Sequence, residues 1–393
     1  MKKFTILAIP AVILAFIFAG TQFTSPENPA FTKPVSVNED RTEIQSPQDV
    51  TNWTTEGYQV KLNNKPFFAK GMGYQPVPVG SHPNDYPNGD YFMKEYSNIY
   101  EPDIKKMRDM GVNAIKIYSW YPDKDHNDFL NKCYNGGNKP IYVAVGYFMP
   151  PGTIIGEFDA KLKLFKQLAE STKNHPAIMG YMLGNENVGG DVNNSAFWTN
   201  YNKIAAALKS IAPNKLTFTG LVDDGMASVK AGNNYMVNLD VWGINVFRGK
   251  TLGNFYSTYQ SASKKPCFIT ELGFPATVRE NGVPKMMPDN ADDVGEYAED
   301  VLNEIHNNSS DDEPDDPIAG VFWFMFCDEW WKQECPACYG SPCACSKSTH
   351  DFTKDNYTDN FPGKYWDEEW FGLYTADRQP RAAVNVIKEL WGH

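Results

Sequence analysis

The sequence predicts a (β/α)8 TIM barrel, an α/β fold, on three observations. Uninterrupted apolar runs alternate with amphipathic helical patterns along most of the 393 residues, which is typical of parallel strands covered on both faces. Eight such runs can be counted, the number that a closed barrel of this kind requires. Two of them end in a glutamate, Glu186 and Glu271. Such barrels carry their functional side chains at the C-terminal ends of the strands.

The predicted elements follow in chain order. The helices are predicted from apolar residues spaced three and four positions apart. The first contains Ile104, Met107 and Met110 and stops at Gly111, a natural helix terminator. Further helices are predicted near residues 125–134, 158–169, 196–211, 255–262, 294–305 and 382–391. The predicted strands span residues 66–74, 112–119, 140–148, 178–186, 216–222, 241–247, 267–271 and 321–326.

The amino terminus resembles an export signal. Lys2 and Lys3 precede a stretch without charge that reaches Gly20, the pattern of a signal peptide. Read over residues 4–23, the stretch approaches the roughly 20 residues that span a bilayer, so a retained membrane anchor is the alternative. We therefore predict a signal peptide or anchor at residues 1–20, a disordered stalk at 21–50 and the barrel at 51–393. The chain is predicted to be secreted or held at the cell surface.

The cysteines are consistent with export. Seven are present, and four lie close together. Two disulfides are the simpler interpretation in an oxidising compartment; a four-thiolate zinc site is the alternative. Two others, Cys267 and Cys327, lie in or beside apolar strand patterns and are predicted core residues. The clustered residues are Cys335, Cys338, Cys343 and Cys345.

A long insertion is predicted after strand eight, at residues 327–371. It contains the cysteine cluster and several aromatic residues, and it exceeds the usual βα connection. Long loops on the functional face commonly shape a substrate cleft; an insertion without substrate contact is the alternative. Its aromatic residues include Trp330, Trp331, Tyr365, Trp366 and Trp370.

The composition narrows the class of partner. The formal charge of -12 and the pI near 5.0 argue against nucleic acid, because polyanion binding depends on basic contacts. Aromatic residues make up 14% of the chain, which suits either sugar stacking or a large barrel core. Neutral polysaccharides or oligosaccharides remain acceptable partners. His82, His126 and His175 do not form a metal-ligand spacing, so neither a metal nor another cofactor is predicted.

The two strand-end glutamates suggest glycoside chemistry. Carboxylates that face each other across a barrel mouth can cleave a glycosidic bond. A separation of about 5–5.5 Å gives retention, and about 6.5–9.5 Å gives inversion. Asn185, immediately before Glu186, can hydrogen-bond the sugar 2-hydroxyl. The alternative for each glutamate alone is a salt bridge at the rim. Trp323 on strand eight is predicted to be either a sugar platform or barrel core.

These motifs resemble a known clan. The runs 184–186 and 269–271, Gly-Asn-Glu and Ile-Thr-Glu, look like those of the large clan of retaining (β/α)8 glycoside hydrolases. The resemblance implies that Glu186 is the acid/base and Glu271 the nucleophile, with Asn185 as a hydrogen-bonding residue.

A narrower resemblance is to the fungal cell-wall β-1,3-glucanosyltransferases. It rests on the runs 67–76, 111–118, 123–128, 223–224 and 242–245. Lys116 stands where the clan usually has arginine and is expected to orient Glu271. Phe247 stands where these enzymes commonly have tyrosine, so Tyr118 or Tyr74 is the candidate for that hydroxyl. The predicted substrate-binding residues are Asn185, Tyr74, Tyr118, Asn245 and Trp323.

The leading hypothesis is a retaining β-glycosidase that acts on a β-glucan, with β-1,3 linkage as the first candidate, by hydrolysis or transglycosylation. A β-mannanase or cellulase-like hydrolase on the same scaffold is the first alternative. A carbohydrate-binding barrel without catalytic activity is the second.

Overall fold

Eight parallel strands close into a barrel, which confirms the predicted fold class. In the computed structural model the neighbours run in the order β10, β13, β4, β5, β6, β7, β8, β9, and β9 pairs with β10. The structure describes residues 51–79, 81–84, 86–288, 292–332, 352–353 and 357–392. The barrel strands are β4 (Ala69–Gly73), β5 (Ala114–Ile117), β6 (Tyr142–Phe148), β7 (Ile178–Asn185), β8 (Leu216–Val222), β9 (Trp242–Asn245), β10 (Cys267–Leu272) and β13 (Ile318–Trp323).

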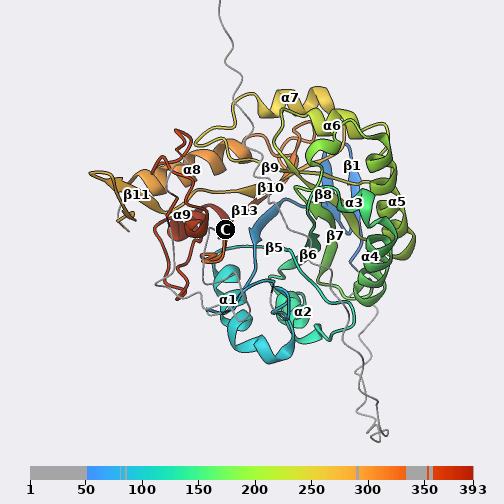
Figure 1. The fold of residues 1–393 in the computed structure, drawn as a ribbon, viewed down its shortest axis with the longest axis horizontal. Helices are drawn as coiled ribbons and strands as arrows, with labels where there is room; N and C mark the ends of the chain where they lie inside the picture. The colour runs from blue at the N-terminus through green and yellow to red at the C-terminus, as the bar shows by residue number, and fades with distance from the viewer. Residues whose placement is uncertain are drawn as a thin grey trace, which may run out of the picture. The chain divides into compact units, whose positions relative to one another are not determined.

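The helices lie around the outside of this barrel (Figure 1). Their apolar faces cover the strands, so nearly every strand residue is buried, as the continuous apolar runs require. The helices are α1 (Ser97–Asp109), α2 (Asn127–Tyr134), α3 (Thr153–Gly156), α4 (Phe158–Thr172), α5 (Ser195–Ile211), α6 (Ala227–Gly232), α7 (Phe255–Ala262), α8 (Asp292–His306) and α9 (Ala383–Trp391).

Most predicted elements are present, and several bounds are corrected. The predicted strand 216–222 and the predicted helix 255–262 coincide with β8 and α7. The first barrel strand begins at Ala69, because Pro66 belongs to a separate antiparallel sheet of β1 (Trp53–Glu56), β2 (Gln59–Leu62) and β3 (Lys65–Pro66). The short helices α3 and α6 and the hairpin of β11 (Thr277–Glu280) and β12 (Val283–Met286) were not predicted.

The eighth barrel strand lies three residues earlier than predicted. It spans Ile318–Trp323 rather than 321–326. Beyond Trp323 the chain leaves the regular ladder: the amide of Phe324 donates to Leu272 O at 2.7 Å, and that of Met325 donates to Phe371 O at 3.1 Å. The apolar residues continue past the strand because they pack under the insertion. The spacing of apolar residues in the sequence does not distinguish this packing from a longer strand.

The described part of the insertion after β13 packs against residues at the C-terminal ends of barrel strands. Trp366 and Phe371 pack edge-on against Phe247, which follows β9, with ring centroids 5.1 and 5.7 Å away. Asp367 accepts from Arg279 of β11 at 2.7 Å, which joins the insertion to the hairpin. Cys267 and Cys327 are buried core residues, as predicted.

Several predictions fall outside the described residues. They are the signal peptide or anchor at 1–20, the possible membrane span at 4–23, the stalk at 21–50 and the four clustered cysteines. Within the ranges that the structure describes, no helix combines the length and apolarity that crossing a membrane requires.

A buried ion pair fixes the start of the insertion. Arg381 donates to both carboxylate oxygens of Asp328, at 2.6 and 2.7 Å, and both side chains are almost fully buried. Asp328 also accepts from the amide of Gly372 at 3.1 Å. The two ends of the insertion are therefore both held at Asp328.

We expect Arg381→Met to lower the free energy of unfolding by about 3–5 kcal/mol, because it leaves the Asp328 carboxylate buried without its cation. Urea denaturation measures this change. Lys105→Met, which breaks the exposed pair with Asp109, is the control and should leave stability unchanged. Equal stability of the two variants would contradict the anchoring role.

Candidate active site

The two predicted glutamates lie at the C-terminal ends of two barrel strands. Glu186 directly follows β7, and Glu271 is the penultimate residue of β10. Glu271 is 6% exposed and Glu186 is partly buried. Burial, followed by the charge of Glu271, raises the pKa of Glu186.

Glu271 is held by two side chains from the β5 segment. Lys116 Nζ and Tyr118 Oη each lie 2.8 Å from Glu271 Oε1. Residues two apart on a strand point to the same face, which is why both reach the same carboxylate. Among the described residues, no hydrogen bond reaches Glu271 Oε2. This oxygen is therefore the one available to a ligand.

The cation and the phenol beside Glu271 are both buried. Lys116 is fully buried; burial lowers the pKa of its ammonium, and the carboxylate of Glu271 opposes that effect. Burial, followed by the charge of Glu271, raises the pKa of Tyr118. Tyr118 therefore stays a neutral hydrogen-bond donor.

Glu186 is positioned by an asparagine on β9, which β8 separates from β7. Asn245 Nδ2 donates to Glu186 Oε1 at 2.8 Å, and Asn245 Oδ1 accepts from Thr270 Oγ1 at 2.7 Å. The backbone of Asn245 also pairs in register with that of Glu271. Burial, then the charge of Glu271, raises the pKa of Glu186. A raised pKa keeps a carboxyl group protonated longer, as a general acid requires.

The backbone at Glu186 adopts an uncommon conformation. Its φ is +51°, in the left-handed region that residues other than glycine and asparagine rarely occupy. The amide of Glu186 donates to Gly220 O at 2.6 Å, which holds this turn against β8. Strained residues of this kind concentrate at functional sites.

Asn185 lies within the same network. Its Oδ1 lies 3.4 Å from Lys116 Nζ and 3.3 Å from Asn245 Nδ2. Since the oxygen accepts from both neighbours, the amide NH₂ is left as the donor toward a ligand.

Two predicted substrate-binding residues lie elsewhere, and their predictions are corrected. Tyr74 is fully buried, and its hydroxyl donates to Asp103 at 3.1 Å, so Tyr118 and not Tyr74 reaches Glu271. Trp323 is 1% exposed and packs edge-on against Phe274. A stacking platform needs an open ring face, so Trp323 belongs to the barrel core.

Three charged residues of the insertion were missed by the sequence reasoning. Lys332 Nζ lies 3.6 Å from a carboxylate oxygen of Glu329 and 3.6 Å from one of Glu368. Burial, opposed by Lys332, raises the pKa of Glu329 to about 7, and the charge of Glu271 is a further cause. The sequence signal for two of them is the charged run Asp-Glu-Trp-Trp-Lys at 328–332.

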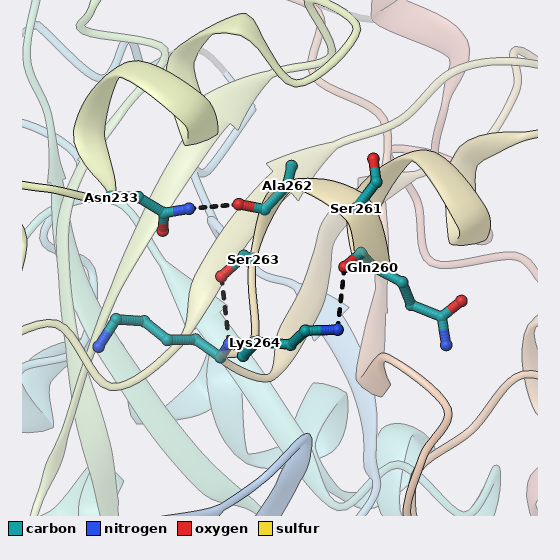
Figure 2. Close-up of a pocket in the computed structure, with 7 residues that line it drawn as sticks. Asn233, Gln260, Ser261, Ala262, Ser263 and Lys264 are labelled. Carbon is teal, nitrogen blue, oxygen red and sulfur yellow. Dashed lines mark hydrogen bonds between the residues drawn. The ribbon is translucent and has the colours of Figure 1, made fainter.

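A surface pocket lies away from this network. It is lined by Asn233 and by Gln260–Lys265, the end of α7 and the loop that leads into β10 (Figure 2). That loop is at the N-terminal end of β10, whereas Glu271 is at the C-terminal end. In the part of the chain that the structure describes, no group of three or more His, Cys, Asp or Glu side chains is placed to hold a metal ion.

Comparison with known proteins supports the resemblance seen in the motifs. Residues 45–211 match the model of a family described as glucanosyltransferase. The chain is 27% identical over 133 residues to the "Probable 1,3-beta-glucanosyltransferase GAS3" of Saccharomyces cerevisiae, covering 32% of this chain and 24% of that protein. It is 23% identical over 234 residues to the "1,3-beta-glucanosyltransferase PGA4" of Candida albicans, covering 53% and 49%. The chain thus spans less than half the length of these relatives, and the predicted resemblance to the glucanosyltransferases is confirmed.

Solved structures share the barrel. A β-D-glucuronidase of Dictyoglomus thermophilum superposes with a TM-score of 0.55 at 17% identity, covering 87% of this chain and 54% of that one. A β-galacturonidase of Eisenbergiella tayi gives 0.59 at 16% identity, with 87% and 54% covered. At this identity the likeness concerns the fold alone.

Proposed function

We propose that this chain cleaves β-glycosidic bonds of a β-glucan, with β-1,3-linked glucan as the first candidate, by a retaining double displacement. The observation that carries the proposal is the asymmetry of the two glutamates. Lys116 and Tyr118 hold one carboxylate oxygen of Glu271 at 2.8 Å each, which orients the group as a nucleophile requires. Glu186 has a raised pKa, which favours the protonated acid. One nucleophile and one acid are what the reaction needs.

In the first step, Oε2 of Glu271 attacks the anomeric carbon as the glycosidic C–O bond breaks. Glu186 gives its proton to the departing oxygen, and a covalent glycosyl ester forms on Glu271. Lys116 and Tyr118 hold the other oxygen, Oε1, and so orient the attacking one. Asn185 is proposed to donate to the sugar 2-hydroxyl, a contact that strengthens in the transition state.

In the second step, Glu186 acts as a base. Its carboxylate removes a proton from water or from the hydroxyl of a second sugar, whose oxygen attacks the anomeric carbon and releases Glu271. Water gives hydrolysis, and a sugar gives transglycosylation. The names of the relatives above favour transfer between β-1,3-glucans as the first activity to test.

The test is to incubate the full chain, as wild type and as Glu271→Ala, with β-1,3-gluco-oligosaccharides and to measure product lengths by mass spectrometry. Products longer than the substrate with wild type alone would support transfer, and shorter ones hydrolysis. Turnover of β-mannan or cellulose oligosaccharides alone would identify that glycan as the substrate in place of β-1,3-glucan. Binding without turnover of any of these would overturn the enzymatic proposal.

Tyr118→Phe is expected to lower kcat roughly 10-fold, because one charge-assisted hydrogen bond to Glu271 is lost. Steady-state kinetics on an oligosaccharide of fixed length measures this change. Tyr74→Phe is the matched control: it removes a hydroxyl bound to Asp103 and should alter stability but not kcat. A lower kcat in Tyr74→Phe than in Tyr118→Phe would contradict the assignment.

We further propose that residues 1–20 direct the chain out of the cytoplasm and that residues 51–393 form the catalytic unit. The charged Lys2 and Lys3 before an uncharged stretch support export. The residues from 51 onward include every strand of the barrel.

A further inference from the structure

Glu329 is a buried carboxylate without a hydrogen bond. It is 2% exposed, and neither Oε1 nor Oε2 has a hydrogen-bond partner among the described residues. The cation beside it is Lys332, at 3.6 Å, beyond hydrogen-bond distance. A buried polar group left in this state destabilises a fold, so a functional reason for it should be sought.

Lys332 also makes no short hydrogen bond to a carboxylate of the described residues. Its Nζ lies 3.6 Å from both Glu329 and Glu368, and its side chain is 31% exposed. An ammonium group has three donors, and at these distances none of them makes a short hydrogen bond to either carboxylate. Among the described residues, the two carboxylate oxygens of Glu329 and the ammonium donors of Lys332 therefore lack a short hydrogen bond.

The position of the two residues is fixed by the backbone around them. Asp328, the residue before Glu329, is held by Arg381. The amide of Glu329 donates to Glu369 O at 3.1 Å, and the amide of Lys332 donates to Glu329 O at 3.0 Å. The segment is thus preorganised, as a binding site requires.

The segment acts electrostatically on the two glutamates of the barrel mouth. The charge of Lys332 lowers the pKa of Glu186, opposing the burial that raises it. The charge of Glu271 contributes to the raised pKa of Glu329. Lys332 Nζ also lies 5.3 Å from the ring centroid of Phe324, at the point where the chain leaves β13. Lys332 therefore lies over the residue that follows β13, and the amide of that residue donates to Leu272 O, next to Glu271 at the C-terminal end of β10.

We propose that Glu329 and Lys332 form a hydroxyl-binding pair for the sugar unit bound beside Glu271. Glu329 accepts hydrogen bonds from two neighbouring hydroxyls, one on each oxygen, and Lys332 donates to a sugar oxygen. The inference rests on the proposed function and adds the residues that recognise the hydroxyl groups of the sugar. It assigns this role to the insertion after β13 rather than to the barrel strands.

The competing explanation is that Glu329 only holds Lys332 as a clip within the insertion. The two explanations differ in how substrate affinity responds. The parent protein for the test is the full chain with Glu271→Gln, which binds without turnover. Calorimetry with a β-1,3-gluco-oligosaccharide measures the Kd of this parent and of the same protein carrying Glu329→Gln or Lys332→Gln. Glu170→Gln, at an exposed glutamate on α4, is the matched control.

We expect Glu329→Gln and Lys332→Gln to weaken binding about 10- to 100-fold, the range for hydrogen bonds to charged groups, with the control unchanged. Oligosaccharides that lack one hydroxyl on the terminal sugar give a second measurement. Removal of the hydroxyl that Glu329 binds should weaken binding to the parent and have little further effect in Glu329→Gln.

Two results would overturn the inference. Binding of Glu329→Gln within twofold of the parent, when wild type turns the glucan over, would overturn the pair and leave the proposed function intact. Absence of both turnover by wild type and binding by the parent would overturn the proposed function and the pair with it. Circular dichroism identifies a variant that has not folded, and Lys332→Gln then carries the test.

Discussion

Replacing Glu271 with alanine is expected to lower kcat/KM on β-1,3-gluco-oligosaccharides by roughly 10⁴-fold or more, the scale seen when a nucleophile is removed. Glu271 is the carboxylate that Lys116 and Tyr118 orient, with one oxygen free for attack. Without it the covalent intermediate cannot form. The measurement is kcat/KM for the wild type and the variant on the same oligosaccharide.

A small anion offers a sharper version of this experiment. In Glu271→Ala, azide can enter the space of the missing carboxylate and attack the anomeric carbon, while Glu186 protonates the leaving oxygen. The product of such a single displacement is a glycosyl azide of inverted configuration. Nuclear magnetic resonance of the product identifies it. Activity within tenfold of wild type for Glu271→Ala without azide would refute the nucleophile assignment.

Replacing Glu186 with glutamine is the second large effect. We expect a loss of roughly 10²–10⁴-fold on natural glucans, the usual contribution of a general acid–base. An aryl glucoside whose leaving group needs no proton should be affected far less in its first step. Glu170→Gln serves as the control and should keep wild-type kinetics. An equal loss on both kinds of substrate would contradict an acid role.

The pH dependence tests the same residue. Burial and the charge of Glu271 raise the pKa of Glu186, so the proton needed for the first step is retained to a higher pH than in an ordinary carboxyl group. Activity should therefore fall as the pH rises through this raised pKa. The pKa of Glu329 is also raised, to about 7. The loss of activity at high pH is therefore assigned to Glu186 only if it is absent in Glu186→Gln. Its persistence there would point to Glu329.

The sequence predicted the elements well wherever one physical signal dominated. The apolar run of β8 and the amphipathic pattern of α7 match the observed bounds, because burial on both faces or on one face sets their periodicity. The signal failed for β13, where apolar residues continue past the strand because they pack under the insertion. The small sheet of β1 to β3 has short strands and a mixed pattern, which carries little periodicity.

The residues of the candidate site were also predictable only where they give a local signal in the sequence. Glu186, Glu271 and Asn185 were found from the sequence because polar residues at the ends of buried strands are conspicuous. Tyr74 and Tyr118 could not be told apart there, since each directly follows a strand.

The sequence by itself determined the barrel and the two carboxylates at its C-terminal end, because both produce a local pattern of apolar and polar residues. The tertiary structure alone decided that Tyr118 rather than Tyr74 reaches Glu271, that Trp323 lies in the core, and that Lys332 lies between Glu329 and Glu368. Each of these depends on how strands are staggered or how a distant segment folds back. Contacts between residues far apart in the chain leave no periodic trace in either partner.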